Sequence, residues 1–250
     1  MDNLHTYKMT ISYDGTSYAG WQFQLNALSI QAVIQNTLEM ILNEKITIHG
    51  SGRTDTGVHA IGQIAHFKHH QILEKKRFLY SMNSLLPDDI RIKDIEEVSS
   101  DFHARFKTRG KIYHYHIHLD PVFCPFTVKY RWHLHHAVDL VKIKKAAQYF
   151  VGTHDFTSFA NKSNFGSAAK DAVRTIKRID LVMQDGGFRL EFEGDGFLYK
   201  MVRNLTGFLV DIGRGKRQYE DIAALLEQKD RRKLSKTAPP QGLFLCQVHY

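Results

Sequence analysis

Within residues 109–119, RGKIYHYHIHL, two kinds of side chain alternate without interruption from Tyr113 to Leu119. Aromatic or aliphatic residues recur at every second position: Tyr113, Tyr115, Ile117 and Leu119. Histidines fill the positions between them: His114, His116 and His118. Because successive side chains of a β-strand point to opposite faces, this segment is predicted to be a strand with an apolar face and a histidine face.

Strand and helix patterns follow one another in both halves of the chain. Strands are predicted within residues 7–22, where the strand runs into a Gly-rich turn, and at 45–52, 61–69, 90–98, 174–184, 188–194 and 243–250. Helical spacing occurs at 28–44, with Ser29 as N-cap, and at 75–86, 140–152 and 219–228. A further helix is expected to begin near Gly196, capped by Asp195. Together with the hairpin signal at residues 185–187, the pattern predicts an α+β fold around a largely antiparallel sheet.

The charge balance favours a polyanionic partner. Lys and Arg number 34 against 26 Asp and Glu, giving a net charge of +8. Basic clusters stand at residues 75–77, 107–111, 142–145 and 229–236. Each alone is typical of a solvated surface, and a merely soluble basic protein remains the alternative. Together they favour contact with a nucleic-acid backbone, with an anionic membrane second.

Cysteine usage and hydropathy point to a soluble protein of a reducing, cytoplasmic compartment. Cys124 and Cys246 are far apart and form no metal-binding pair. No apolar run approaches the ~20 residues of a membrane span. The three strand histidines could converge on a metal, but without an evident fourth ligand solvent-facing histidines are preferred. The tyrosine face is expected in the core, or at a cleft edge where it could stack on a base.

The loop GSGRTDTGVHA, residues 50–60 and hereafter the Asp55 loop, holds three glycines around Arg53 and Asp55. Glycines permit backbone conformations that present neighbouring side chains outward. A solvated turn is one interpretation. A phosphate-binding loop is a second, but Val58 and His59 stand where it would need Lys and Ser or Thr. A catalytic nucleophile or base is the third, because a nearby cation keeps a carboxylate ionised.

A second polar group is expected on the helix within residues 194–213. Lys200, Arg203, Asn204 and Gly207 share one helical face by their spacing. A surface polar face is the simple interpretation. A helix packed beside an anionic site is the alternative, because Gly207 permits close approach.

Seven segments resemble, in order, the tRNA pseudouridine synthase A family: YDGTSYAGWQFQ, GSGRTDTGVHA, LPDDIRI, FHARFKTRGKIYHY, GTHDFTSF, GDGFLYKMVRNLTG and TAPPQGLFLCQVHY. The resemblance implies that Asp55 is the catalytic aspartate and that Arg203 pairs with it. It also implies that Tyr113 contacts the substrate and that Arg53 binds or displaces the target nucleotide. Lys200 joins the substrate-binding residues.

The chain departs from the family pattern at Lys200, where histidine is common, and at Thr56, where alanine or lysine is commoner. Neither change removes a catalytic group, but both leave the substrate range open.

The resemblance further implies two related, RNA-recognition-like lobes that share a continuous sheet across a basic cleft. Residues 1–105 would carry the catalytic Asp loop, and residues 106–250 the Tyr strand and Arg helix. The expected substrate is uridine at positions 38, 39 and 40 of the tRNA anticodon stem and loop, bound by a homodimer without cofactor or metal. A non-catalytic RNA-binding protein of the same fold is the alternative. A nucleotide hydrolase is disfavoured.

Overall fold

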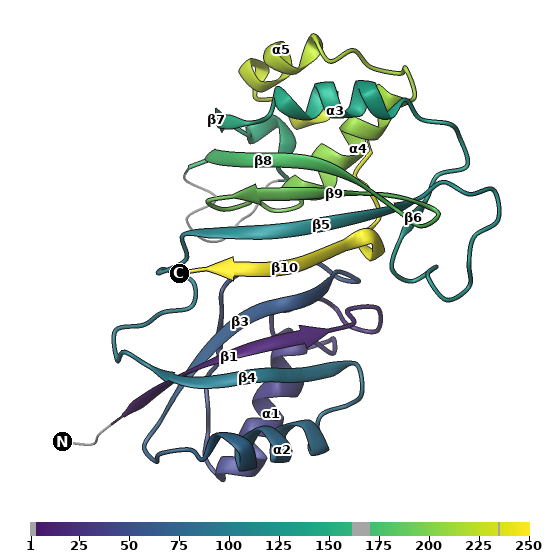
Figure 1. Cartoon of the computed structure of the whole chain (residues 1–250). Coiled ribbons are helices and arrows are strands. Elements are labelled where there is room, and N and C mark those ends of the chain that lie inside the picture. The colour runs from purple at the N-terminus through teal and green to yellow at the C-terminus, as the bar shows by residue number, and fades with distance from the viewer. Residues whose placement is uncertain (1–3, 162–170, 235) are drawn as a thin grey trace. The chain divides into compact units, whose positions relative to one another are not determined.

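The computed structural model describes residues 4–161, 171–234 and 236–250, which form two compact units (Figure 1). Unit 1 comprises Met1–Arg109 and Phe244–Tyr250, and unit 2 comprises Gly110–Leu243. Ser235, within the basic cluster at 229–236, lies outside the described residues. Both units contain strands and helices, so the predicted α+β class is confirmed.

Unit 1 has the strand–helix–strand–strand–helix–strand order of a split βαβ domain. Its elements are β1 (His5–Tyr13), α1 (Ile30–Leu42), β2 (His49–Gly50), β3 (His59–His69), α2 (Lys75–Leu85), β4 (Ile90–Val98) and β10 (Leu243–His249). Strands β4, β1, β3 and β10 lie in that order, and β2 pairs with β3. All these pairings are antiparallel except that of β10 with β3. Both helices lie on the same side of this sheet (Figure 1).

The C-terminal strand is the main difference from the expected division at residue 105. Residues 243–250 are expected in the second lobe, but Phe244 and Leu245 pair with His59 and Ala60 of β3. Parallel pairing requires a long connection, and here the whole of unit 2 separates the two strands in the sequence. Strand β10 therefore completes the sheet of unit 1, beside the strand that follows the Asp55 loop.

Among its described residues, unit 2 also combines strands and helices, with three strands between its first two α-helices. Its elements are β5 (Gly110–His118), β6 (Trp132–His133), α3 (Leu140–Gln148), β7 (Gly152–Asp155), β8 (Val173–Gln184), β9 (Gly187–Gly194), α4 (Met201–Gly213) and α5 (Asp221–Gln228). Within the unit β5, β9, β8 and β7 are antiparallel neighbours in that order. Gly186 joins β8 to β9 with φ of 67°, confirming the hairpin predicted there.

Helix α1 shows how local sequence sets an element. The Ser29 side chain accepts a hydrogen bond from the Ala32 N–H, which confirms the predicted N-cap. Ile30, Ile34 and Leu38 are fully buried and recur every four residues, so one face of the helix packs on the sheet. The described residues include no helix long and apolar enough to cross a membrane.

The start of α4 differs from the expectation. The helix begins at Met201, and Lys200 precedes it in the left-handed region with φ of 60°. Asp195 does not cap this helix; its carboxylate accepts from the Thr175 N–H at 3.1 Å. The Asp195 N–H also donates to the Thr175 carbonyl at 3.0 Å. Asp195 therefore extends the pairing of β8 with β9, and the helix begins six residues later, at Met201.

Burial of His66 makes the stability of the fold pH-dependent. His66 is 3% exposed, and its Nδ1 accepts from the Ala104 N–H at 3.2 Å. Burial is the main cause that lowers the pKa of His66 from 6.5 to about 4. In the unfolded chain His66 therefore becomes protonated near pH 6.5, whereas in the folded chain it becomes protonated only near pH 4.

We therefore expect the free energy of unfolding to fall as the pH is lowered from about 6.5 to 4, and this contribution to be constant above that range. The loss from His66 is on the order of 3 kcal/mol, since one pKa unit corresponds to about 1.4 kcal/mol. His66→Asn keeps an acceptor near Ala104 and should lose less stability on acidification than the unaltered chain in urea titrations. Exposed His70→Asn serves as the control, and equal pH slopes for all three chains would contradict the prediction.

Candidate active site

The five predicted site residues fall into two sets, one in each unit. Arg53 and Asp55 lie in unit 1, on the Asp55 loop between β2 and β3. Tyr113 lies on β5 of unit 2, and Lys200 and Arg203 lie at the start of α4 in the same unit. Each set has its own local support.

The backbone of residues 15–21 supports the Asp55 loop. The Trp21 N–H donates to the Thr54 carbonyl at 3.1 Å. Gly20 has φ of 88°, and a Cβ at this position would collide with the same carbonyl oxygen. On the other side of the loop, a Cβ on Gly50 would lie 2.6 Å from the Trp21 ring. The loop is therefore fixed by backbone contacts that only glycine permits.

Side chains beneath the loop complete its support. The Tyr13 and Thr54 hydroxyls are hydrogen-bonded at 2.8 Å, and both side chains are buried. The Ser51 hydroxyl donates to Gln63 Oε1 at 2.7 Å, while Gln63 Nε2 donates to the Gly52 carbonyl at 3.0 Å. The sequence pattern did not single out Tyr13 and Gln63, because they lie on β1 and β3 and contact the loop only in the fold.

The tip of the loop turns around Asp55. The Val58 N–H donates to the Asp55 carbonyl at 3.1 Å, and Gly57 adopts φ of 74°. Of the three glycines expected to adopt special conformations, only Gly57 does so, while Gly50 serves close packing against Trp21. Asp55 is half-buried and Arg53 is exposed. The loop thus presents a carboxylate and a guanidinium from a backbone that is fixed by hydrogen bonds.

Amide side chains connect Arg53 to the body of unit 1. Its Nε donates to Gln22 Oε1 at 3.1 Å, and Gln22 Nε2 donates to Gln31 Oε1 at 2.9 Å. Gln31 in turn donates through Nε2 to the Ile48 carbonyl at 3.0 Å. This relay begins on α1 and ends at the exposed Arg53. Gln22 and Gln31 are therefore functional candidates that the sequence pattern did not reveal.

Tyr113 belongs to the buried face of β5. Tyr113, Tyr115 and Ile117 are 7%, 0% and 0% exposed, which confirms the predicted apolar face. The Tyr113 ring meets Phe197 edge-on, with 5.3 Å between ring centroids. Its neighbour Tyr115 donates from its hydroxyl to the Pro239 carbonyl at 2.7 Å. The edge-on contact with Phe197 thus orients the predicted substrate-binding tyrosine.

The segment 236–240, hereafter the C-terminal strap, is bound to the start of α4. Arg203 Nε donates to the Ala238 carbonyl at 2.8 Å, and the Ala238 N–H donates to the Arg203 carbonyl at 3.1 Å. A Cβ on Gly207 would collide with the Lys236 carbonyl oxygen, so the strap lies directly on the helix. These contacts fix the plane of the Arg203 guanidinium.

Asn204 organises a buried polar network beside Arg203. Its Oδ1 accepts from Arg231 at 2.9 Å and from the Thr237 hydroxyl at 2.7 Å. Its Nδ2 donates to the Phe159 carbonyl at 2.9 Å and to Asn161 Oδ1 at 3.1 Å. Because Asn204 is 1% exposed, the interpretation of this helix face as a solvated surface is wrong. Arg231 and Thr237 are partners that the spacing on one helix could not indicate.

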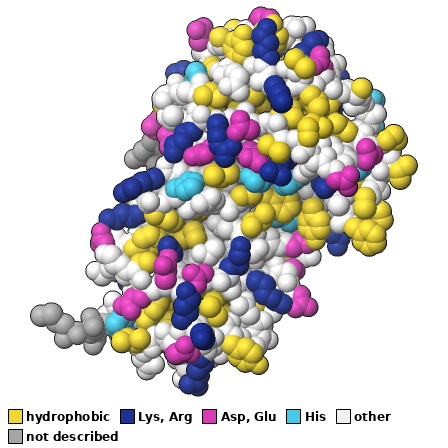
Figure 2. Space-filling model, in the orientation of Figure 1, with side chains coloured by type: hydrophobic (Ala, Val, Ile, Leu, Met, Phe, Trp, Pro, Cys, Tyr) yellow, Lys and Arg dark blue, Asp and Glu magenta, His cyan; other side chains and the backbone are white. Residues whose placement is uncertain are grey.

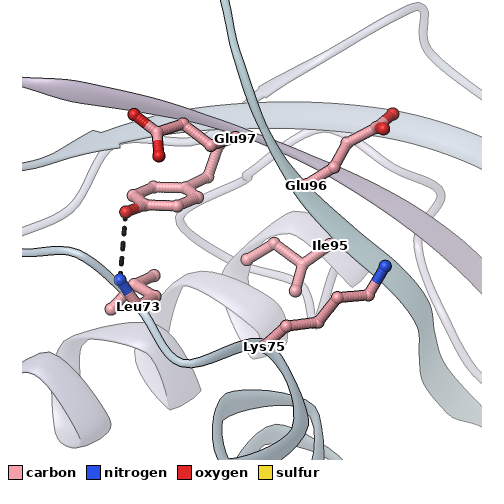
Figure 3. A pocket seen from close by; sticks show the side chains of 6 residues that line it. Leu73, Lys75, Ile95, Glu96 and Glu97 are labelled. Atoms are coloured by element: carbon pink, nitrogen blue, oxygen red, sulfur yellow. Dashed lines mark hydrogen bonds between the residues drawn. The ribbon is translucent and has the colours of Figure 1, made fainter.

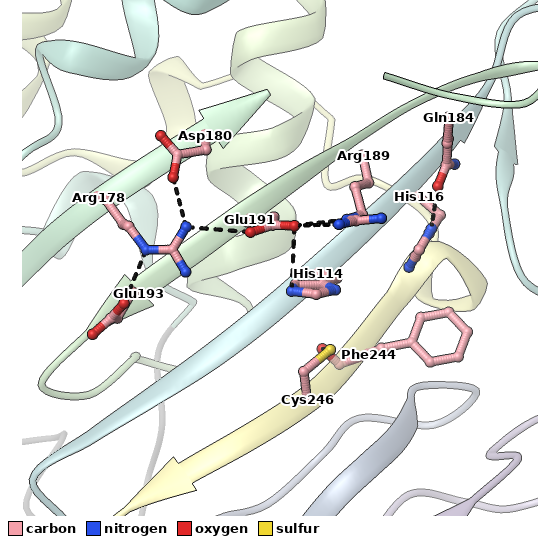
Figure 4. Close-up of polar contacts among 10 residues, drawn as sticks. All are labelled: His114, His116, Arg178, Asp180, Gln184, Arg189, Glu191, Glu193, Phe244 and Cys246. Atoms are coloured by element: carbon pink, nitrogen blue, oxygen red, sulfur yellow. Dashed lines mark hydrogen bonds and ion pairs between the residues drawn. The ribbon is translucent and has the colours of Figure 1, made fainter. Parts of the chain in front are cut away.

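The histidine face of β5 forms part of a charged ladder with β8 and β9 (Figure 4). Glu191 lies at its centre, 2.6 Å from Arg189, 3.2 Å from Arg178 and 3.7 Å from His114. Burial opposes ionisation of Glu191, but the two arginines outweigh it and lower its pKa. The positive charges of Arg178 and Arg189 are thus paired with Glu191, so this ladder offers little net positive charge to a polyanion.

The expectation that all three strand histidines face solvent is wrong for His118. This residue is 4% exposed and stacks on Phe123, with 4.8 Å between ring centroids. His116 is half-buried, and burial lowers its pKa to about 4. No group of three or more His, Cys, Asp or Glu side chains among the described residues is arranged to hold a metal ion.

A pocket elsewhere in unit 1 contains none of the predicted site residues. Its lining consists of Tyr7, Leu73, Lys75, Ile95, Glu96 and Glu97 (Figure 3). The Leu73 N–H donates to the Tyr7 hydroxyl at 3.1 Å. Two glutamates beside one lysine disfavour a phosphate group. On the face in Figure 2, basic and acidic side chains are interspersed, and no continuous basic patch is evident there.

Comparison with known proteins identifies what the chain resembles. The sequence matches the family described as tRNA pseudouridine synthase over residues 9–107 and 146–250. It is 53% identical to tRNA pseudouridine synthase A 1 of Protochlamydia amoebophila, over 99% of this chain and 97% of the relative. It is 42% identical to tRNA pseudouridine synthase A of Acetivibrio thermocellus, covering 99% and 100% of the two chains. For the enzyme of the same name from Chlamydia muridarum, the identity is 44%, over 97% and 91%.

The contact of Gly207 with the C-terminal strap makes Gly207→Ala a diagnostic change. In an ordinary helix this substitution stabilises by about 1 kcal/mol. Here the added methyl group displaces the strap, so we expect a net loss of about 1–3 kcal/mol, measured by thermal unfolding. Gly196→Ala is the control, because its Cβ would lie 3.6 Å from the Arg174 side chain. A Gly207→Ala chain as stable as the unaltered one would show that the strap does not rest on α4.

Proposed function

Since the chain belongs to the tRNA pseudouridine synthase family and isomerises uridine to pseudouridine in tRNA, we propose that Asp55 is its catalytic carboxylate. The observation that carries this proposal is the support of the Asp55 loop. Backbone contacts from Gly20 and Trp21 hold a half-buried aspartate at the tip of a turn. A group held in this way reaches its reacting position without a loss of conformational entropy during the reaction.

The reaction itself defines what the protein must supply. The uracil N1–C1′ bond breaks, the base turns, and a bond forms between C5 and C1′ while the C5 proton is lost. The sequence of steps neither oxidises the nucleotide nor adds atoms to the product. It requires a carboxylate that stays anionic beside the ribose or the base, and walls that retain the detached uracil. Asp55 supplies the first in this proposal.

Arg203 is proposed as the counter-ion of Asp55. A carboxylate in a site without water needs a nearby cation to remain ionised. Arg203 suits this role because the Ala238 carbonyl fixes its Nε, leaving the orientation of the guanidinium defined. A fixed guanidinium loses less freedom on pairing than a mobile lysine does.

Tyr113, Arg53 and Lys200 are proposed to bind the substrate. The Tyr113 ring, held by Phe197, would stack on the uracil and keep it in place after the bond to the ribose breaks. The exposed Arg53 would meet the incoming nucleotide and help displace it from the stem. Lys200, half-buried at the start of α4, would contact a phosphate.

The family resemblance extends the proposal to assembly and substrate. We propose that the two units are RNA-recognition-like lobes that share a continuous sheet and a basic cleft. The chain would act as a cytoplasmic homodimer on uridines 38, 39 and 40 of the anticodon stem and loop. Flipping a uridine out of a stem costs a few kcal/mol, which contacts with the tRNA backbone would offset.

The experiment that tests the activity is tritium release from tRNA labelled at uridine C5, followed by mapping of the modified positions. Release requires substitution at C5, so it separates a synthase from a protein that only binds RNA. Absence of release from a folded, tRNA-binding preparation would support the non-catalytic alternative. Release from uridines outside the anticodon stem and loop would overturn the proposed position alone.

Asp55→Asn is expected to reduce tritium release by about three orders of magnitude or more, because the substituted amide cannot act as nucleophile or base. The fold should be retained, since Thr54, Val58 and glycine contacts hold the loop and asparagine is nearly the same size as aspartate. The affinity for tRNA should change little. Full turnover by a highly purified variant would refute the role of Asp55.

Arg203→Ala should lower the single-turnover rate by about a hundredfold or more, with a much smaller effect on tRNA affinity. Arg203→Lys retains the charge but loses the guanidinium fork, and should restore the rate only in part. Arg232→Ala, which removes a side chain that is 90% exposed, is the matched control for lost positive charge. If the alanine variants at 203 and 232 have equal rates, Arg203 is not the counter-ion.

A further inference from the structure

Residues 102–109 of unit 1, hereafter the aromatic turn, carry an aromatic side chain that the active site does not use. The turn connects β4 to β5 and has the sequence FHARFKTR. Its Phe106 is 75% exposed. Leaving a phenylalanine in water forfeits on the order of 2 kcal/mol of burial, which makes its position informative.

The aromatic turn is rigid. His103 Nδ1 accepts from the N–H groups of Arg105 at 3.1 Å and Phe106 at 3.4 Å. The Thr108 hydroxyl donates to the Ala104 carbonyl at 2.8 Å, and the same carbonyl accepts from the hydroxyl of Tyr250 at 2.7 Å. These bonds fix the backbone on both sides of Phe106. The ring is therefore held in solvent by the fold and is not the end of a mobile loop.

Phe106 is the outermost of three rings that contact one another in sequence, the inner pair edge-on and the outer pair tilted. His66 lies 4.6 Å from His103, and His103 lies 4.2 Å from Phe106, between ring centroids. Burial lowers the pKa of His103 below its ordinary value, in agreement with a neutral ring that accepts hydrogen bonds through Nδ1. The tilted contact with His103 supports one side of Phe106, while the high exposure leaves room for another planar group.

One basic side chain lies over this exposed ring, and two more stand close to it in the sequence. The Arg105 guanidinium lies 5.8 Å from the centre of the Phe106 ring. Arg105 and Arg109 are both exposed, and Lys107 is paired with Asp101 at 2.6 Å. A supported aromatic ring among cations suits a nucleobase joined to phosphates. The same cations disfavour an apolar protein surface, which would have to desolvate them.

We propose that the aromatic turn is a second tRNA contact, in which Phe106 stacks on an unpaired base while Arg105 and Arg109 meet the adjoining phosphates. The contact is separate from Asp55. The Val58 N–H donates to the Asp55 carbonyl at 3.1 Å, so Asp55 lies near the start of β3, and the seven steps along this strand from His59 to His66 span about 23 Å. The nucleotide bound here is therefore not the uridine that reacts. The inference rests on tRNA as substrate, and it is independent of the role of Asp55.

The test compares tRNA affinity and rate for Phe106→Ala, Phe106→Trp and the unaltered chain. Loss of one base–aromatic stack should raise the dissociation constant about tenfold or more, whereas tryptophan should preserve it. The single-turnover rate at saturating tRNA should stay the same for all three. Tyr80→Ala on α2, which removes a side chain that is 76% exposed, is the matched control and should leave the affinity unchanged.

The salt dependence of tRNA affinity tests the phosphate contacts separately from the stacking contact. Arg105→Gln should weaken binding and reduce the slope of log affinity against log salt concentration by about one. Phe106→Ala should leave that slope unchanged, because stacking releases no counter-ions. The indole introduced by Phe106→Trp should change its fluorescence on addition of tRNA, measured as the difference from the unaltered chain, which provides a readout even where the alanine variant folds poorly.

Unchanged affinity in a folded Phe106→Ala chain would overturn the proposal. A change in molecular mass on sedimentation, without a change in the affinity per subunit, would show instead that Phe106 contacts a second copy of the chain. These outcomes differ from failure of the catalytic proposal, because dissociation constants measured in the Asp55→Asn background require no turnover. An active Asp55→Asn chain would leave the result for Phe106 standing.

Discussion

The close approach of two backbone segments at Gly20 and Thr54 is the constraint on which the Asp55 loop depends. A side chain at residue 20 would occupy the space of the Thr54 carbonyl, and φ of 88° at this residue already favours glycine. The carbonyl accepts from Trp21 in the same place. The loop therefore cannot shift outward without losing a hydrogen bond, or inward without a collision. Such a support suits a carboxylate whose distance from a reacting carbon must be held within a fraction of an ångström.

In unit 2 the side chain of Arg203 is also held in place, here by side-chain hydrogen bonds. Arg203 depends on a peptide carbonyl of the C-terminal strap, and the strap depends on Asn204 through Thr237. Because Asn204 is buried, each of its hydrogen bonds would be costly to lose without replacement. The network connects residues far apart in the sequence, so it orders the strap only when the whole unit is folded. Asn204 thus supports the strap segment that fixes the Arg203 side chain.

The sequence was sufficient where local signals decide the structure. Alternation predicted β5, which extends from Gly110 to His118, and the Ser29 cap predicted the start of α1. The prediction that Asp195 caps a helix was wrong. This residue directly follows β9, and its carboxylate accepts a hydrogen bond from the Thr175 N–H, so it is not used as a helix cap. The glycine, arginine and aspartate pattern identified the Asp55 loop. Its supports could not be found in this way, since Tyr13 and Thr54 are separated by 41 positions and meet only through the pairing of β1 with β3.

The distribution of charge explains why aromatic contacts matter to such an enzyme. A net charge of +8 attracts tRNA, but acidic side chains are mixed with basic ones on the face in Figure 2, and the ladder of Glu191 is neutralised within the sheet. Phosphate contacts are also the same for every base pair of a stem and weaken as salt rises. Opening a stem at one position requires contacts that favour the distorted RNA over the regular helix. A rigid exposed ring provides such a contact, because it can stack only on a base that has left its neighbours.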